Sequence, residues 1–345
     1  MNPTSPTSPA RARAGARTAT IPAPRAALPP GGPQGVDPSR AREAVRNLYA
    51  RTALTPADLT APLLVLPEGH PSAGALPGAV VLSDVAATVR RWDAMGIAGV
   101  KIFAHGQDRS PDASAALAPG NLMIRAIEAV KTAAAGLAVT TEVCGCSWTT
   151  AHECVLRTDA GSIDTEGTYA LMQGMAVQHA DAGADVVSPT AMLTGSVHAV
   201  RRALDDQGHR DVGVNPNLAI RTTLYGAFKT VMDTEPAGGD RRGLQLEPGR
   251  CDRSALVQAR AWVAEGADSF TLQPVMTAAD LLVRLRADQD VPITAYSTSG
   301  EWAALKTLGV EGMTEYLVML RRAGADSILT FAAETVAAFL EARRG

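Results

Sequence analysis

The sequence predicts a closed (β/α)8 barrel, the TIM-barrel fold, and two observations predict it. First, eight short apolar runs of β-type residues alternate with amphipathic helical stretches, which is the pattern of a parallel sheet covered by helices. Second, a glycine-containing joint between a helix and the next strand recurs along the chain, as a repeating βα unit requires. An open doubly wound sheet is the alternative, but no Gly-x-Gly-x-x-Gly motif follows an early strand.

Each predicted strand is followed by helix-compatible sequence. The eight strands span residues 62–66, 99–104, 137–143, 185–188, 212–215, 269–272, 292–296 and 327–331. Three of the joints read Gly-Ala-Asp and begin at Gly183, Gly266 and Gly324, while residues 95–98 form a looser copy. Glycine at a helix end adopts the left-handed cap conformation without strain. The small alanine that follows lets the next strand begin close behind the cap.

The first 60 residues differ in composition from the rest of the chain. Residues 1–36 are rich in alanine, proline and arginine, which predicts a disordered tail, although a transit peptide has the same composition. Residues 37–60 contain a helical pattern from Ala41 to Tyr49 and a helix-start signal at Thr55-Pro56. The barrel is expected over residues 61–345.

The composition excludes several classes of protein. The formal net charge of −3 over 345 residues gives no electrostatic reason to bind nucleic acid or an anionic membrane. No apolar run approaches the roughly 18–20 residues that a membrane span needs. Four cysteines in so long a chain do not make a disulfide scaffold, which favours a reducing, cytoplasmic location.

Three of the four cysteines form a Cys-x-Cys-x7-Cys motif, made of Cys144, Cys146 and Cys154, at the end of the third predicted strand. The active site of a TIM barrel lies at this end of its strands. Three thiolates can hold Zn²⁺ and leave its fourth position open, as in a catalytic site. Three unrelated buried thiols or a reversible disulfide are the alternatives. Cys251, alone in a charged stretch, is expected to be a free thiol.

The cysteine segment resembles the zinc-binding strand and loop of the 5-aminolevulinate dehydratase (porphobilinogen synthase) family, and the similarity runs from about Arg46 to Leu340. It includes residues 54–59, 76–78, 121–131, 179–189, 225–228, 239–241, 245–248, 295–301 and 328–330. The resemblance implies a zinc-dependent barrel in which residues 37–60 are an N-terminal arm. Through this arm the family assembles into homo-oligomers, from dimers to octamers.

The chain departs from this family at both imine-forming lysines. The family condenses two 5-aminolevulinate molecules, each held as an imine on its own lysine, and the similarity places these lysine positions on Ala219 and Gln273. Neither side chain can form an imine, because that reaction needs a primary amine. Of the four lysines present, Lys101 lies inside the second predicted strand. It could be a relocated imine-forming residue or a structural lysine in a polar layer.

The remaining candidate site residues come from the resemblance and from positions at the predicted strand ends. The substrate-binding candidates are Arg241, Lys229, Gln245, Ser299, Gln273 and Asn215, and the catalytic candidates are Glu142, Tyr296 and Lys101. Glu142 could act as a general base or support a metal ligand, with an interior ion pair as the alternative. Arg241 could instead be a surface ion-pair residue. His105 and His152 are additional candidates, with solvated loop histidines as the alternative. Further departures from the family pattern fall on Ala191, Thr194 and Phe331.

These observations predict a zinc-dependent lyase that acts on a small, amino-acid-like molecule with a carboxylate. Because the imine lysines are missing, we expect dehydration, condensation or cyclisation without imine catalysis and no efficient synthesis of porphobilinogen. Two alternatives remain open. One is an authentic 5-aminolevulinate dehydratase that makes porphobilinogen, and the other is a non-catalytic binding or regulatory relative.

Overall fold

The computed structural model describes residues 42–49, 54–238 and 241–343, and the chain divides into two units at Arg51 and Thr52. The first unit contains one described helix, α2 (Glu43–Tyr49), within the helical pattern that the sequence predicts from Ala41. The predicted disordered tail, residues 1–36, and the start of the predicted arm lie outside the described residues. The second unit holds the remaining elements.

The second unit is built on one curled parallel sheet, and each of the eight predicted runs contains a strand. The barrel strands are β1 (Leu59–Leu66), β3 (Gly99–Ala104), β4 (Ala138–Val143), β7 (Val186–Pro189), β8 (Gly213–Val214), β9 (Asn217–Ala219), β10 (Phe270–Gln273), β11 (Ile293–Ser297) and β12 (Ser327–Thr330). A short strand, β2 (Ala79–Val81), pairs with β1, and β5 (Leu156–Arg157) pairs antiparallel with β6 (Ile163–Asp164).

The sheet closes through a strand that is interrupted at Pro216, and the fifth predicted strand, residues 212–215, contains only the first part of it. Its first part, β8, pairs with β7, and its second part, β9, pairs with β10. Proline has no N–H to give to a ladder, but its carbonyl still accepts a hydrogen bond from the Thr271 N–H at 3.0 Å. Because β8 and β9 are consecutive pieces of one strand, the ring is complete and the predicted (β/α)8 barrel is confirmed.

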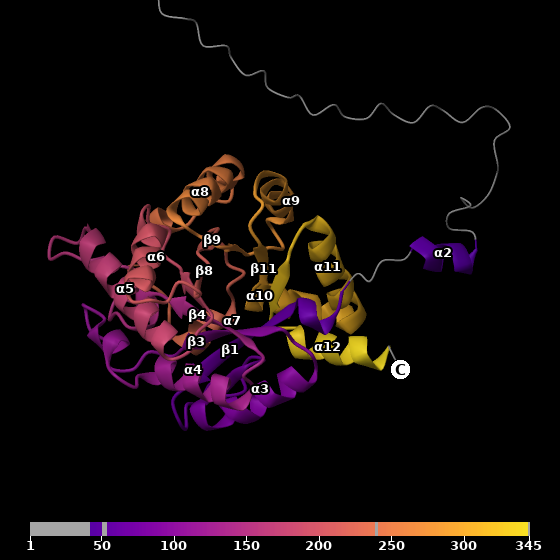
Figure 1. Cartoon of the computed structure of the whole chain (residues 1–345), viewed down its shortest axis with the longest axis horizontal. Coiled ribbons are helices and arrows are strands. Elements are labelled where there is room, and N and C mark those ends of the chain that lie inside the picture. The colour runs from indigo at the N-terminus through magenta and orange to yellow at the C-terminus, as the bar shows by residue number, and fades with distance from the viewer. Residues whose placement is uncertain (1–41, 50–53, 239–240, 344–345) are drawn as a thin grey trace, which may run out of the picture. The chain divides into compact units, whose positions relative to one another are not determined.

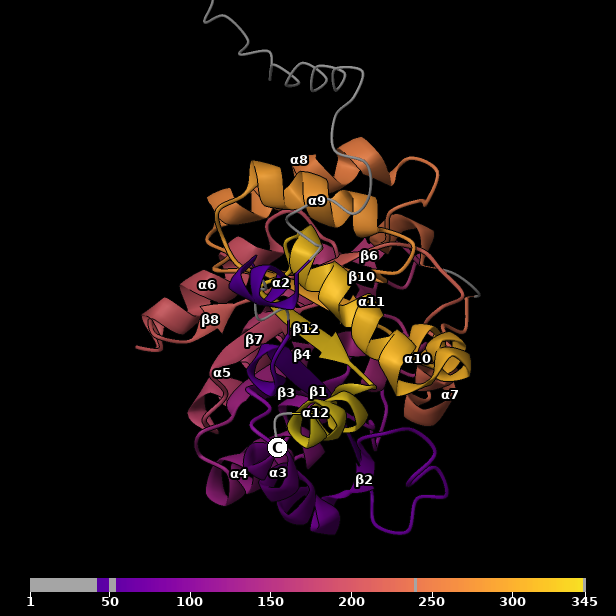
Figure 2. The ribbon, with the colours of Figure 1, turned by 90° about the vertical axis from the view of Figure 1, so that its right-hand side faces the viewer.

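Helices surround the strands (Figure 1). The longer helices are α3 (Val85–Ala94), α4 (Leu122–Ala133), α5 (Thr165–Asp181), α6 (Ser196–Asp206), α8 (Cys251–Glu265), α9 (Ala279–Asp288), α11 (Gly309–Ala323) and α12 (Ala333–Ala342). Two shorter helices, α7 (Ala227–Met232) and α10 (Ser299–Leu305), lie near the centre of this view. Figure 2 shows β12 between α11 and α12. The predicted glycine caps are present, since Gly266 and Gly324 end α8 and α11 with φ of 101° and 116°.

The barrel begins earlier than the sequence predicts. The helix-start signal at Thr55 gives only a single 3-10 turn, η1 (Pro56–Asp58), in which Thr55 and Asp58 form a capping box. Strand β1 then starts at Leu59, which pairs with Ile328 of β12. The predicted boundary between residues 60 and 61 therefore lies inside a strand. The reason is that residues 59–66 are almost all buried, as expected of a strand covered on both faces.

The apolar core has two parts, and the smaller one borders the site described below. The larger part lies mainly between the strands and the surrounding helices and includes Trp92, Trp262 and Phe270. The smaller part includes Phe103, Tyr296 and other buried side chains, among them Leu64, Leu66, Val231, Met232, Leu329 and Phe331. Within the described residues, no helix is long and apolar enough to cross a membrane.

Candidate active site

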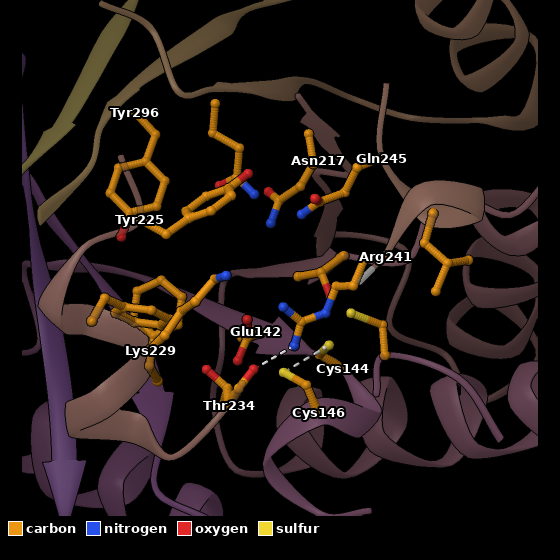
Figure 3. A pocket seen from close by; sticks show the side chains of 17 residues that line it. Glu142, Cys144, Cys146, Asn217, Tyr225, Lys229, Thr234, Arg241, Gln245 and Tyr296 are labelled. Carbon is orange, nitrogen blue, oxygen red and sulfur yellow. Dashed lines mark hydrogen bonds between the residues drawn. The ribbon is translucent and has the colours of Figure 1, made fainter. Parts of the chain in front are cut away.

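A pocket lies at the carboxyl ends of the barrel strands. It is lined by Phe103, Glu142, Cys144, Cys146, Cys154, Thr190, Asn217, Ala219, Tyr225, Phe228, Lys229, Thr234, Arg241, Leu244, Gln245, Gln273 and Tyr296. The lining comes from the ends of β3, β4, β9, β10 and β11, from the loops after β4 and β7, and from the segment between residues 225 and 245 (Figure 3). This is the end of the barrel at which TIM-barrel active sites form.

The three clustered cysteines form one corner of this pocket. Cys144 follows β4 directly, and Cys146 lies in the 3-10 turn η4 (Gly145–Ser147). The loop then returns, because the Gly145 N–H donates to the Cys154 carbonyl at 3.3 Å. As a result the three Sγ atoms lie within 4.8 Å of one another, and those of Cys144 and Cys146 are 3.1 Å apart. No disulfide joins them, and Cys251 is also a free thiol.

The environment of the cluster favours a thiolate on Cys154. Hydrogen bonds from the thiols of Cys144 and Cys146, together with the positive charge of Arg241, hold the pKa of Cys154 well below its usual value. Burial raises the pKa of Cys144 in the opposite direction. A thiolate on Cys154 would lie beside a fixed cation, and a metal ion held by the cluster would neutralise its charge.

Tyr225 and Tyr296 form an aromatic wall on one side of the pocket (Figure 3). Arg241 lies across the pocket from this wall, with its guanidinium close to the cysteines. Its Nη2 donates to the carbonyls of His152 at 3.0 Å and Thr234 at 2.6 Å, so it joins the cysteine loop to the segment after α7. Burial alone would lower the pKa of Arg241, but the three cysteines raise it above the usual value. The surface ion-pair alternative does not describe this residue, because it lines the pocket.

The same two segments are joined by Arg109 and His152. Arg109 Nη1 donates to the Cys146 carbonyl and its Nη2 to the Asp233 carbonyl, both at 2.8 Å. The Nδ1 atom of His152 lies 2.6 Å from the same Asp233 carbonyl. Neither side chain lines the pocket. The structure therefore gives His152 a role in holding the loop, and the sequence analysis did not find Arg109.

His105 does not line the pocket either. Its ring packs on that of His70 with centroids 4.6 Å apart, and burial lowers its pKa. The adjacent Gly106 passes so close to the cysteine loop that an added Cβ would lie 1.3 Å from the Ser147 carbonyl oxygen. The loop after β3 thus supports the cysteine loop from outside the pocket.

Two of the predicted substrate-binding side chains, Lys229 and Gln245, point into the same space as Arg241 (Figure 3). Lys229 comes from α7, where its ammonium lies 3.2 Å from the Glu235 carboxylate and 5.8 Å from the centre of the Tyr225 ring. Arg241 and Lys229 therefore both bring cations to the pocket, and the Glu235 carboxylate pairs with Lys229. A guanidinium or an ammonium can hold a substrate carboxylate.

Ala219 and Gln273 lie side by side on the pocket wall. They are register partners at the ends of the neighbouring strands β9 and β10, and both line the pocket. Neither carries an amine. All four lysines are among the described residues, and only Lys229 lines the pocket. Lys131 is paired with Asp185, and Lys306 lies over the Trp302 ring.

Lys101 points into the barrel but lies outside the lining of the pocket. Its side chain is 2% exposed, and its Nζ donates to Ser188 Oγ at 2.8 Å and to Asn217 Oδ1 at 3.0 Å. Burial lowers its pKa, which the Glu142 carboxylate opposes. Burial likewise raises the pKa of Glu142, and Lys101 opposes that rise. Of this pair, only Glu142 reaches the pocket.

Two predicted substrate-binding residues do not line the pocket. The amide of Asn215 is used inside the barrel, where it bonds Ser269 and Thr271 at 2.7 and 2.6 Å. The Ser299 hydroxyl donates to the Tyr225 carbonyl and accepts from the Phe228 N–H, so it fixes α10 against α7. Tyr296 does line the pocket, with its ring stacked between those of Phe103 and Phe331.

Asn217 is the most informative residue that the sequence analysis missed. Side chains alternate in direction along a strand, so a residue two positions before Ala219 faces the same way. That signal was available, but Pro216 obscured where the strand continued. Phe103, Tyr225 and Thr234 also line the pocket and carry no comparable sequence signal.

Comparison with known proteins identifies the family. A family model described as Delta-aminolevulinic acid dehydratase matches residues 36–339. The chain belongs to the delta-aminolevulinic acid dehydratase family. The enzyme of that name from Synechococcus elongatus is 32% identical over 316 residues, which cover 87% of this chain and 97% of the relative. The one from Methanothermobacter thermautotrophicus is 34% identical over 300 residues, covering 83% and 91%.

A solved structure agrees with this assignment. The delta-aminolevulinic acid dehydratase of Toxoplasma gondii, determined in complex with the reaction product porphobilinogen, superposes with a TM-score of 0.84 at 29% identity. The match covers 91% of this chain and 94% of the other. The resemblance noted in the sequence is thus confirmed at the level of family and fold.

Members of the delta-aminolevulinic acid dehydratase family are metal-dependent in general, and the cysteine cluster fits a metal ion. Thiolates bound to tetrahedral Zn²⁺ at about 2.3 Å lie about 3.8 Å from one another. The three Sγ atoms, all within 4.8 Å, need little movement to reach that spacing. All three are buried, and they face a pocket through which a fourth ligand can enter.

Proposed function

We propose that this member of the delta-aminolevulinic acid dehydratase family is a zinc-dependent lyase that works without imine catalysis. Its substrate would be a small amino-acid-like molecule with a carboxylate, which is dehydrated, condensed or cyclised. The observation that carries the proposal is the pair Ala219 and Gln273, which stand on the pocket wall where the resemblance places two lysines. An alanine and an amide cannot form an imine with a ketone.

Zinc is proposed on the donor set of the cluster. Cys144, Cys146 and Cys154 would hold it, and three thiolates with one open position suit zinc better than a hard cation such as Mg²⁺. When bound, the ion would supply Lewis-acid polarisation of a substrate oxygen or nitrogen. Glu142, on the strand that leads into the cluster, reaches the same pocket.

The remaining residues have roles that follow from their positions. Arg241, Lys229 and Gln245 would bind and orient the substrate carboxylate, because they present two cations and an amide to the pocket. Glu142 would accept or return a proton during dehydration. Tyr296 would hold the substrate against the aromatic wall, where Phe103 and Phe331 stack on it.

A second candidate is the formation of porphobilinogen from 5-aminolevulinate. The comparisons support it better than changed chemistry, since the relatives described above carry that enzyme's name and the solved relative holds that product. The residues of this chain favour the first proposal. To form an imine, an authentic dehydratase would have to use Lys229, or Lys101 after a rearrangement that opens the barrel interior.

One experiment separates the two candidates. Purified full-length protein is incubated with 5-aminolevulinate, with and without borohydride, and assayed for porphobilinogen colour and for a covalent adduct by intact mass. Our proposal predicts neither turnover at a useful rate nor an adduct, because losing both imines removes several kcal/mol of barrier lowering for each. Turnover comparable to that of an ordinary dehydratase would overturn it. An adduct on Lys101 or Lys229 would show that the imine has moved.

We also propose that the chain forms a homo-oligomer through its N-terminal arm and acts in the cytoplasm. The family resemblance supports the first point, and the free cysteines support the second. A non-catalytic relative is the least supported function, because the chain retains an open pocket with three clustered thiols.

A further inference from the structure

Asn217 connects the pocket with the polar interior of the barrel. It lies on β9 two residues before Ala219, and its side chain lines the pocket. Its Oδ1 atom accepts a hydrogen bond from Lys101 Nζ at 3.0 Å and lies 3.1 Å from Ser188 Oγ. The three residues come from three different strands, β3, β7 and β9.

These contacts leave one orientation for the carboxamide. An ammonium group has only N–H donors, so the atom of Asn217 that faces Lys101 must be the oxygen. The NH2 group then faces away from the interior, and Figure 3 shows the Asn217 amide directed into the pocket. Among the described residues, no hydrogen bond from Nδ2 is found.

Lys101, which orients the Asn217 amide, is itself fixed by a second hydrogen bond. Its ammonium also donates to Ser188 Oγ at 2.8 Å, and Ser188 in turn lies 2.6 Å from the Asn215 carbonyl. Ser188 is fully buried, and Lys101 and Asn217 are each 2% exposed. Turning the Asn217 amide over would bring its NH2 group against an ammonium with no room for water between them. Such a clash between donors is costly in a buried setting.

We propose that Asn217 is a specificity-determining residue that donates an N–H to a carbonyl or carboxylate oxygen of the substrate, and that Lys101 is the positioning residue that fixes this donor. The proposal rests on the function proposed above and deepens it. The small side chain of the neighbouring Ala219 leaves room for the substrate to approach this wall. The Asn217 amide would thus bind the carbonyl oxygen of the substrate. In an enzyme that forms an imine, the lysine nitrogen takes the place of that oxygen.

The arrangement defines a class of substrate. Arg241 and Lys229 offer positive charge to one carboxylate, and Asn217 offers a neutral donor to a second oxygen-bearing group elsewhere in the pocket. An oxo acid such as 5-aminolevulinate, the substrate of the family, has both groups, whereas an acid with an amine in place of the oxo group would present N–H donors to the Asn217 N–H. A site built around a hydrogen bond rejects the analogue that cannot form it.

The test compares two probes of similar length, levulinate and 4-aminobutanoate, by calorimetric titration of the full-length, zinc-loaded protein. The wild type should bind levulinate more tightly, by about tenfold or more. The oxo group of levulinate accepts a hydrogen bond from Asn217, whereas the amine of 4-aminobutanoate presents its own N–H groups to the Asn217 N–H. In Asn217→Asp, one carboxylate oxygen still accepts from Lys101 while the other faces the pocket as an acceptor. The preference should therefore reverse toward 4-aminobutanoate.

Two further variants separate recognition from structure. Ser188→Ala removes one support of Lys101 and should reduce the preference for levulinate without reversing it. Asn121→Asp is the matched control outside the pocket lining, because aspartate keeps the oxygen that caps α4 and loses only the hydrogen bond from Nδ2 to the Ala116 carbonyl. Its preference should equal that of the wild type.

Several outcomes would overturn the proposal. One is an unchanged preference in Asn217→Asp, in protein whose melting curve shows that it is folded. Another is a wild type that binds neither probe. If the preference reverses as expected but no lyase activity is found on any oxo acid, the recognition role of Asn217 stands and the proposed enzymatic function fails.

Discussion

At the scale of single residues, the candidate site depends on a few side chains whose charges are fixed by their neighbours. Arg241 stands between the cysteine cluster and the segment after α7, where it bonds two carbonyls and faces three thiols. Lys101 is enclosed in the barrel, where it bonds Asn217 and opposes the rise in the pKa of Glu142. Lys101 therefore acts on the pocket through its neighbours, whereas Arg241 lines the pocket itself.

Removal of one clustered cysteine should abolish zinc binding. Because the three thiols are within 4.8 Å of one another, Cys146→Ala leaves two ligands, too few for tight binding in an open site. Elemental analysis should find about one zinc per wild-type chain and little in the variant. Cys251→Ala is the matched control, since that thiol lies on α8 away from the cluster, and should retain full zinc. Equal zinc in all three proteins would exclude the cysteine site.

Part of the loss of folding stability at acidic pH should come from His179. Its ring is buried, with Nδ1 2.9 Å from Thr141 Oγ1, and burial lowers its pKa from 6.5 to about 3. Between these values the unfolded chain binds a proton that the folded chain does not, so stability falls as the pH drops below 6.5. The contribution is at most about 1.4 kcal/mol per pH unit for one group.

Chemical denaturation at several pH values checks this. His179→Gln, which cannot titrate, should lose less stability than the wild type between pH 6.5 and pH 5. His198→Gln, at an exposed position on α6, should follow the wild-type curve. Parallel curves for wild type and His179→Gln would show that another group causes the acid sensitivity.

At the scale of elements, the site is an assembly of loops supported by a rigid ring of strands. The loop after β3 lies against the cysteine loop, and Arg109 and Arg241 tie the cysteine loop to residues 232–234. A change in one loop is therefore transmitted to the next through close contacts and carbonyl hydrogen bonds. The strands themselves contribute Glu142, Asn217 and Gln273 from fixed positions.

Gly106 should be intolerant of any side chain. An added Cβ would lie 1.3 Å from the Ser147 oxygen, which is backbone and cannot rotate away. We expect Gly106→Ala to displace the cysteine loop, to reduce zinc content well below that of the wild type and to lower stability by several kcal/mol. Gly120→Ala has open space around its Cβ, although its φ of 65° adds some strain. The Gly120→Ala protein should keep its zinc. A Gly106→Ala protein with normal zinc content and a normal melting temperature would contradict the prediction.

The elements were more predictable than the details of the site. The eight strands follow from apolar runs and glycine joints, because a strand buried on both faces needs continuous apolar sequence. The cysteine corner follows from spacing alone. Asn215 and Ser299 were expected in the pocket but do not line it. Pro216 separates β8 from β9, and the Asn215 amide just before it bonds Ser269 inside the barrel. The Ser299 hydroxyl accepts a hydrogen bond from the Phe228 N–H of α7. Such outcomes depend on contacts between distant segments, and a single sequence does not reveal them.

At the scale of the whole molecule, the barrel is a complete unit from Leu54 onward, and residues 1–51 form a separate unit. Leu54 and Leu59 are buried at the start of the barrel unit. Leu48 and Tyr49 lie on α2 of the other unit, which the family resemblance predicts to pack on a second barrel.

Deletion of the arm should change the oligomeric state. Because β1 starts at Leu59, the truncated protein should begin at Thr52, which leaves the barrel intact. Light scattering should show a larger assembly for the full-length protein than for the truncated one. A Leu48→Asp, Tyr49→Asp double variant tests the same surface without deletion, and a second control lacking only residues 1–36 should assemble like the full chain. If all of these proteins were monomers, the arm would have no role in assembly.

The register between β9 and β10 also determines how lysines placed at positions 219 and 273 would affect each other. Residues 219 and 273 are direct neighbours, on strands about 4.8 Å apart, so two amines there would each depress the proton affinity of the other. Replacing one lysine would remove that influence and leave a more basic, less reactive amine behind. The effects of Ala219→Lys and Gln273→Lys should therefore not be additive. In the double variant, the lysine amines should have a lower pKa than the amine of either single variant.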